Sequence, residues 1–118
     1  MAKEKDFENK VKDYLKHIGA WFLKYWAGAD YTKEGIPDIL ACIDGRFYGI
    51  ELKAEHGRPK LIQLVKLCQI RKAGGVGLLL YPKDLDEFIA FTQGVDNGFY
   101  AANIMLQDEW YKKLNMNS

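Results

Sequence analysis

Three charged side chains lie at the ends of two short apolar segments in the stretch "GIPDILACIDGRFYGIELKAEHG", residues 35–57. Asp38 opens the first segment, and Glu51 and Lys53 close the second. A charged group inside a sheet raises the free energy of the folded state unless it pairs, binds a metal or reaches water. These residues therefore mark either an ordinary solvated end of a sheet or a site that does chemistry.

The two segments are predicted to form an antiparallel hairpin. Residues 38–43 and 46–53 are rich in β-branched and aromatic side chains, which is typical of strands. They are joined by Asp44-Gly45, a dipeptide that supplies the positive φ angles of a type I′ turn. The turn then fixes which residues face each other across the hairpin.

Pairing outward from this turn places Asp38 opposite Glu51, with Cβ atoms about 4.5–5.5 Å apart. Two like charges so placed repel each other unless a cation lies between them, and Mg²⁺ prefers such oxygen ligands. Lys53 projects from the same face as Glu51. The arrangement fits metal-assisted phosphodiester hydrolysis, in which the lysine positions the attacking water or stabilises charge on the phosphate. The alternative is a solvated cluster in which Lys53 neutralises both acids.

The pattern around the hairpin predicts an α/β sandwich, with a mixed central β-sheet flanked by helices in the order α-β-β-β-α-β-α. Apolar residues spaced three and four apart predict helices, and short apolar runs bounded by glycine predict strands. The chain after Gly94 gives no clear topology. The predicted helices are 4–18, 59–73 and 83–93, and the further strands are 20–27 and 76–81.

Length and composition are those of a single ordinary domain. The chain has 118 residues, of which 48% are hydrophobic and 28% charged, enough for one substantial core. There is no signal-peptide pattern and no apolar run long enough to span a membrane, so we expect an intracellular, cytoplasmic protein. Cys42 and Cys68 lie in apolar segments and are expected to be buried thiols.

Charge is distributed unevenly, although the formal net charge is only +1. Residues 46–72 carry seven basic and two acidic side chains, whereas residues 84–109 carry six acidic and no basic ones. A molecule polarised in this way can present one basic face to a phosphate backbone. Runs of charge are also typical of solvated helix faces, so this pattern alone does not decide for nucleic-acid binding.

The residues "IPD" at 36–38 and "IELK" at 50–53 resemble the signature of the PD-(D/E)xK nuclease superfamily, in which a Pro-Asp opens one strand and Glu-x-Lys lies on the next. The first helix and strand are similar to those of archaeal Holliday-junction resolvases and virus-type replication-repair (VRR-NUC) nucleases. The stretch "ELKAEHGRPKLIQLVKLCQIRKAGGVGLLLY" resembles the VRR-NUC pattern. The resemblance covers about residues 5–92 and implies a restriction-endonuclease-like fold. Residues 1–118 would form one nuclease domain, with 94–118 as an extension.

The resemblance implies a site for Mg²⁺, with Mn²⁺ able to substitute. Asp38 and Glu51 would bind the ion together with the backbone carbonyl of Leu52. In these nucleases a Glu on the first helix completes the metal site, and Glu8 takes that place here, at the flank of the apolar stripe of its helix. The alternative for Glu8 is an exposed carboxylate paired with Lys12.

The resemblance also implies how a substrate would be held. Lys53 would act on the nucleophile. Gln63, on the helix that follows, would hydrogen-bond the scissile phosphate or a metal-bound water, and a solvated helix glutamine is the alternative. Candidates for phosphate contacts are Lys33, Arg58, Lys60 and Lys66.

Together these features predict a divalent-metal-dependent DNA endonuclease, selective for Holliday junctions or other branched DNA in replication, recombination or repair. A domain of this length is expected to lack a separate DNA-reading module, which favours recognition of DNA structure. Symmetrical cutting of a junction calls for a two-fold homodimer. One alternative is a non-catalytic nucleic-acid-binding module on the same fold, and another is a regulatory or structural protein with a solvated acidic cluster. The presence of all three of Asp38, Glu51 and Lys53 favours the nuclease.

Overall fold

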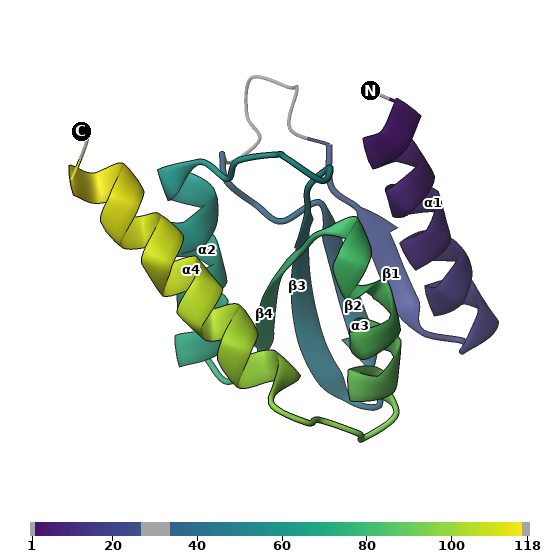
Figure 1. The fold of residues 1–118 in the computed structure, drawn as a ribbon. Helices are drawn as coiled ribbons and strands as arrows, with labels where there is room; N and C mark the ends of the chain where they lie inside the picture. Colours follow the sequence, from purple (N-terminus) through teal and green to yellow (C-terminus); the bar gives the residue numbers. More distant parts are fainter. Residues whose placement is uncertain (1, 27–33, 117–118) are drawn as a thin grey trace.

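The protein is an α/β sandwich in which a four-stranded sheet lies between helices (Figure 1). A computed structural model describes residues 2–26 and 34–116. The predicted order α-β-β-β-α-β-α is confirmed, and the chain after Gly94 adds a long helix to it. The elements are α1 (Ala2–His17), β1 (Trp21–Lys24), β2 (Ile39–Ile43), β3 (Arg46–Leu52), α2 (Leu61–Lys72), β4 (Val76–Leu80), the short 3₁₀ helix η1 (Pro82–Asp84), α3 (Leu85–Thr92) and α4 (Phe99–Met116).

The sheet is mixed, with its strands in the order β1-β2-β3-β4. The first three strands are antiparallel, and β4 runs parallel to β3. The hairpin pairs Ile43 with Arg46 and Ile39 with Ile50, which is the predicted register. Asp44 has φ 50° and the glycine after it φ 79°, as a type I′ turn requires.

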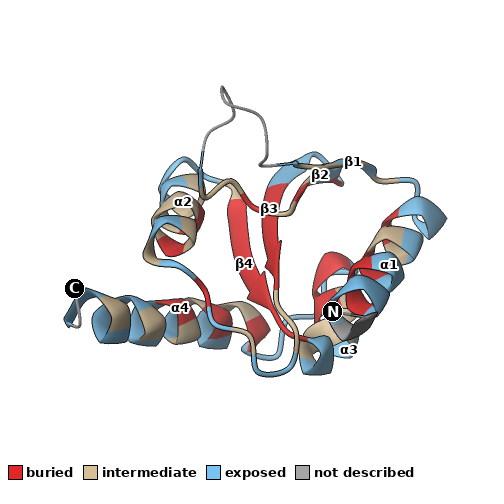
Figure 2. Ribbon diagram, turned by 90° about the horizontal axis from the view of Figure 1, so that it is seen from above, coloured by how far each residue is buried: buried red, intermediate tan, exposed pale blue. Residues whose placement is uncertain are grey.

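Helices cover both faces of the sheet, and the buried residues are concentrated in the central strands (Figure 2). On one face, α1 and α3 pack on Ile39, Ile50 and Leu52. On the other face, α2 and α4 pack on Leu79. Because side chains alternate along a strand, Glu51 points to the α2 face, between two core residues of the opposite face.

One corner of the sheet is exposed to solvent. The prediction that both cysteines are buried thiols was therefore wrong. Cys42 is exposed and Cys68 is partly buried, and both are free thiols. Cys42 lies between Trp21 and Phe47, which are 64% and 46% exposed, so none of the described helices covers this end of β1 and β2. In the part of the chain that the structure describes, no helix combines the length and the apolar character needed to cross a bilayer.

Side chains of α4 close the open edge of β4. The Asn103 side chain accepts a hydrogen bond from the N–H of Leu79 (3.0 Å) and donates one to its carbonyl (2.8 Å). Gln107 Nε2 donates to the carbonyl of Gly77 at 2.9 Å, and the Arg71 guanidinium donates to Gln107 Oε1. These amides take the place of a fifth strand, so that buried backbone groups at the edge stay paired.

Replacing Asn103 by leucine should destabilise the protein. We expect the free energy of unfolding to fall by about 2–3 kcal/mol, because two buried backbone groups of Leu79 lose their partners. The measurement is chemical denaturation. Ala102→Leu, at the neighbouring exposed position of the same helix, should change that free energy by less than about 0.5 kcal/mol. Equal effects of the two changes would contradict this role for the edge hydrogen bonds.

Candidate functional site

Asp38 and Glu51 meet where the hairpin opens, away from its turn. One step beyond the pair of Ile39 and Ile50, the same register brings the two carboxyl groups together. Asp38 Oδ2 accepts a hydrogen bond from the N–H of Leu52 at 2.8 Å, and the Asp38 carbonyl accepts one from Tyr25 N–H at 2.8 Å. Asp38 is therefore fixed from both neighbouring strands, with its carboxylate turned toward the end of β3.

Glu51 is a buried acid with an unsatisfied oxygen. Glu51 is only 2% exposed, and its Oε1 has no hydrogen-bond partner among the described residues. Burial, and then the charge of Asp38, raise the pKa of Glu51 from its ordinary 4.5 to about 8, even though the Lys53 ammonium lies 3.3 Å from Oε2. A carboxyl group in these surroundings binds either a proton or a further cation.

The donor set at this point fits a hard divalent cation. Asp38 and Glu51 offer carboxylate oxygens, which Mg²⁺ prefers, and the unpaired Oε1 is the kind of atom that a bound cation satisfies. Among the residues that the structure describes, however, no group of three or more His, Cys, Asp or Glu side chains is close enough to hold a metal ion. The third predicted acid therefore needs separate consideration.

Glu8 lies on α1, on the opposite face of the sheet from Glu51, and is 6% exposed. Its Oε1 is 2.8 Å from Lys24 Nζ, and its Oε2 is 3.2 Å from Lys12 Nζ. Burial raises the pKa of Glu8, but the hydrogen bonds and charges of the two lysines outweigh burial and hold that pKa below its usual value. The pairing with Lys12 is present, but the exposed carboxylate of that alternative is not, because Glu8 is buried. A role for Glu8 as a metal ligand stays a prediction.

Lys24, on β1, connects Glu8 to Asp38 and was missed in the sequence analysis. Its Nζ lies 2.8 Å from Glu8 Oε1 and 3.5 Å from Asp38 Oδ1. Burial lowers the pKa of Lys24, but the two carboxylates outweigh that effect and raise it. Lys24 pairs with Ile39, the residue after Asp38, so a single lysine within the predicted strand 20–27 was the available signal.

Several solved structures resemble this chain, and two of them are informative. One is named as a VRR_NUC domain: it is 26% identical, with a TM-score of 0.61, over 74% of this chain and 94% of that one. The other is Hjc of Archaeoglobus fulgidus, named as a Holliday junction resolvase: 21% identical, with a TM-score of 0.51, over 65% of this chain and 66% of that one. No protein-family model and no curated protein matches the sequence.

This chain has the PD-(D/E)xK nuclease fold. The resemblance inferred from the sequence is thereby confirmed, as is the restriction-endonuclease-like sandwich. The likeness to the VRR_NUC domain supports a nuclease role. The likeness to Hjc concerns the fold alone. The signature residues Asp38, Glu51 and Lys53 lie together where β2 begins and β3 ends, close to the Glu8–Lys24 pair.

The surroundings of Lys53 and Gln63 are also defined. The side chain of Lys53 is 13% exposed, and its backbone N–H donates to the carbonyl of Leu80 at 2.9 Å, so it is fixed just beyond β3. Gln63 lies in the first turn of α2, where its Oε1 accepts a hydrogen bond from the N–H of Lys60 at 2.9 Å. Gln63 thus caps the helix through its Oε1. Its contact with a phosphate stays a prediction.

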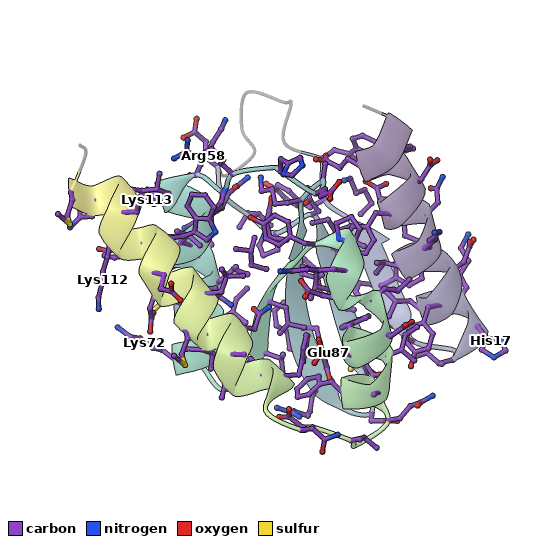
Figure 3. The ribbon with its side chains drawn as sticks, in the orientation of Figure 1. His17, Arg58, Lys72, Glu87, Lys112 and Lys113 are labelled. Carbon is purple, nitrogen blue, oxygen red and sulfur yellow. The ribbon has the colours of Figure 1, made fainter. Side chains whose placement is uncertain are left out.

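Three of the predicted phosphate contacts, Arg58, Lys60 and Lys66, belong to the described residues and differ in exposure. Arg58 (Figure 3) and Lys60 are exposed on the loop between β3 and α2. Lys66 is partly buried on α2. Lys33 lies outside the described residues. Exposure and proximity to Lys53 favour Arg58 and Lys60 for contact with a large polyanion.

The pKa of Glu51 predicts an unusual dependence of stability on pH. Since this pKa is about 8 in the folded protein against an ordinary 4.5, the folded state binds the proton more tightly. In EDTA, the contribution of Glu51 is therefore fully favourable below about pH 4.5 and is lost as the pH rises to about 8. Glu51→Gln should raise Tm at pH 8.5 by roughly 4–8 °C, with little effect at pH 5.

The measurement is thermal unfolding of wild type and variant at the two pH values, with EDTA present. Glu55→Gln is the matched control, because Glu55 is exposed and lies in the loop just after the site. A Tm difference between Glu51→Gln and wild type that is the same at pH 5 and pH 8.5 would contradict the raised pKa.

Lys24 should stabilise the folded protein mainly through its ion pair with Glu8. Lys24→Met should lower the free energy of unfolding at pH 7 by about 1–3 kcal/mol, because it leaves the buried carboxylate with less compensation. Glu8→Gln in the same chain should recover most of that loss. A double-mutant cycle from chemical denaturation measures the coupling. Additive effects of the two changes would show that the ion pair does not stabilise the fold.

Proposed function

We propose that this protein is a divalent-metal-dependent DNA endonuclease that hydrolyses phosphodiester bonds. The observation that carries the proposal is the buried Glu51 carboxyl, with one oxygen unpaired, between Asp38 and Lys53. A side chain that only fills space at this position would be apolar, or would be fully hydrogen-bonded. An acid kept beside a second acid, at a cost in stability, is typical of a site with a chemical task.

Asp38, Glu51 and the backbone carbonyl of Leu52 would hold Mg²⁺, with Mn²⁺ able to replace it. When bound, the ion would neutralise charge that develops on the phosphate and lower the pKa of the attacking water. The Leu52 N–H and the Lys24 ammonium keep the Asp38 carboxylate oriented for this task. Glu8 would join through water, because its own oxygens are engaged by lysines.

Lys53 is the group of the chain best placed to act on the reacting phosphate. Its ammonium lies 3.3 Å from Glu51 Oε2 and is mostly shielded from water. It can donate a hydrogen bond to a phosphate oxygen or to the nucleophilic water without reorganising, which is how a preorganised cation stabilises a transition state. Gln63 would donate its free NH₂ hydrogens to the same phosphate or to a metal-bound water.

The substrate is proposed to be branched DNA, such as a Holliday junction, in replication, recombination or repair inside the cell. Two related cuts in a junction require two active sites, which we propose a homodimer supplies. Edge strand β1 supports this, because Trp21 and Leu23 are 64% and 38% exposed, and the nearby Trp26 is 70% exposed. The molar mass in solution, from light scattering, tests the dimer.

The proposed activity can be tested by cleavage of matched DNA substrates. These are a four-way junction, a flap, a linear duplex and a single strand, each with Mg²⁺ or with EDTA. The wild-type protein should cut DNA with Mg²⁺ present and not with EDTA, and it should prefer a branched substrate. Asp38→Asn and Lys53→Met should each lower the rate by at least about 100-fold, since each removes a preorganised charge at the reacting group.

Lys72→Met is the control for lost positive charge, because Lys72 is exposed at the far end of α2 (Figure 3). Its rate should stay within about 3-fold of wild type. If folded wild-type protein binds DNA but cuts none of the substrates, the non-catalytic nucleic-acid-binding module becomes the better description.

A further inference from the structure

A groove of about 950 Å³ adjoins the candidate active site and extends from α1 to α4. The loop that follows Lys53 forms one wall of it, through residues 55–58. Asp38, Glu51 and Lys53 are not among its lining residues, so the groove is a separate surface beside the reacting groups. A strand of substrate leaving the active site over this loop would enter the groove.

Trp110 of α4 forms part of the lining, and its ring is held in place. The Trp110 side chain lies beside the Tyr81 hydroxyl, which itself donates to the carbonyl of Gly57 at 2.8 Å. Part of the ring packs against the cluster of Leu64, Leu67 and Leu79. The remainder faces the groove, which makes Trp110 a fixed aromatic platform.

Two exposed cations lie against this ring. Arg58 Cζ is 5.4 Å from the ring centroid and Lys113 Nζ is 5.0 Å from it, and Figure 3 shows both at the same end of the molecule. Cation–π contacts of exposed side chains are weak, so both groups can turn to a phosphate at little cost. Lys10 and Lys83 also line the groove.

The balance of charge in the groove is positive. Its lining carries four Lys or Arg side chains against two acidic ones, Asp6 and Glu55. An aromatic platform flanked by mobile cations in an open basic groove is the combination that binds single-stranded nucleic acid, with bases stacked and phosphates contacted by the cations. A base inside a duplex offers no free face to an indole ring, so duplex DNA would leave Trp110 unused.

We propose that this groove binds an unpaired arm of the DNA substrate, with a base stacked on Trp110 and phosphates contacted by Arg58 and Lys113. The proposal rests on the nuclease function and adds a binding site to it. The unpaired nucleotides would belong to a flap, a gapped end or an opened branch next to the cleaved bond. The groove would thereby select DNA that carries a single-stranded segment.

Binding is measured by fluorescence anisotropy with the full chain in EDTA, on a blunt duplex and on the same duplex carrying a short oligothymidine arm. The arm should tighten binding about 5- to 10-fold. Trp110→Leu should abolish that gain, and Trp110→Phe, which keeps a ring and the packing, should retain part of it. Tyr111→Leu, at an exposed aromatic residue of α4 outside the groove, should leave the gain unchanged.

Salt dependence separates phosphate contact from packing. For the armed duplex, Lys113→Gln and Arg58→Gln should each reduce the slope of log Kd against log salt concentration by about 0.7. Lys112→Gln is the matched control, since Lys112 is the exposed neighbour on α4 and does not line the groove (Figure 3). If thermal unfolding shows that Trp110→Leu is not folded, Trp110→Phe, Lys113→Gln and Arg58→Gln test the proposed arm site instead.

The proposed arm site would be overturned if wild type bound the armed and the blunt duplex with equal affinity. It would also be overturned if the Trp110 variants lost the same affinity for both duplexes. Metal-dependent cleavage lost in Asp38→Asn would in that case leave the nuclease proposal standing. Conversely, a gain that depends on Trp110 in a protein that cuts no DNA would support the groove and reject the nuclease.

Discussion

The register of the β2–β3 hairpin is the constraint on which the candidate site depends. The Asp44-Gly45 turn fixes that register, and the buried pair of Ile39 and Ile50 holds it on the core face. A slip by one residue would turn every side chain of a strand to the opposite face. The same pairing that buries the apolar residues therefore brings Asp38 to Glu51, and chemistry and core packing depend on one geometrical choice.

This geometry leaves a row of charged side chains across the end of the sheet. Glu8, Lys24 and Asp38 follow one another from α1 to β2, and Lys53 then lies beside Glu51. The weak point of the row is the direct approach of Asp38 to Glu51, where burial and like charge together raise the pKa of Glu51. A fold selected for stability alone would replace one of these acids, so their retention favours a function that needs both oxygens.

Local patterns predicted the hairpin, the signature residues and most helices, because turn chemistry and side-chain alternation act over a few residues. The importance of Lys24 could not be read locally, since it depends on pairing with Ile39, fifteen positions away in the chain. Helix α4 was missed because two of its three buried positions, Asn103 and Gln107, are polar. Both side chains pair with backbone groups of β4. Because these buried positions are polar, the sequence lacks the apolar period by which helices are recognised.

Helix α4 connects the sheet edge with the groove. Asn103, Gln107 and Trp110 follow at intervals of four and three residues, so one face of the helix closes β4 and then reaches the groove. The position of the Trp110 ring is consequently set by hydrogen bonds made up to two turns earlier. A segment without a recognisable motif can thus support a substrate site through backbone pairing of the sheet, and changes at Asn103 should alter arm binding as well as stability.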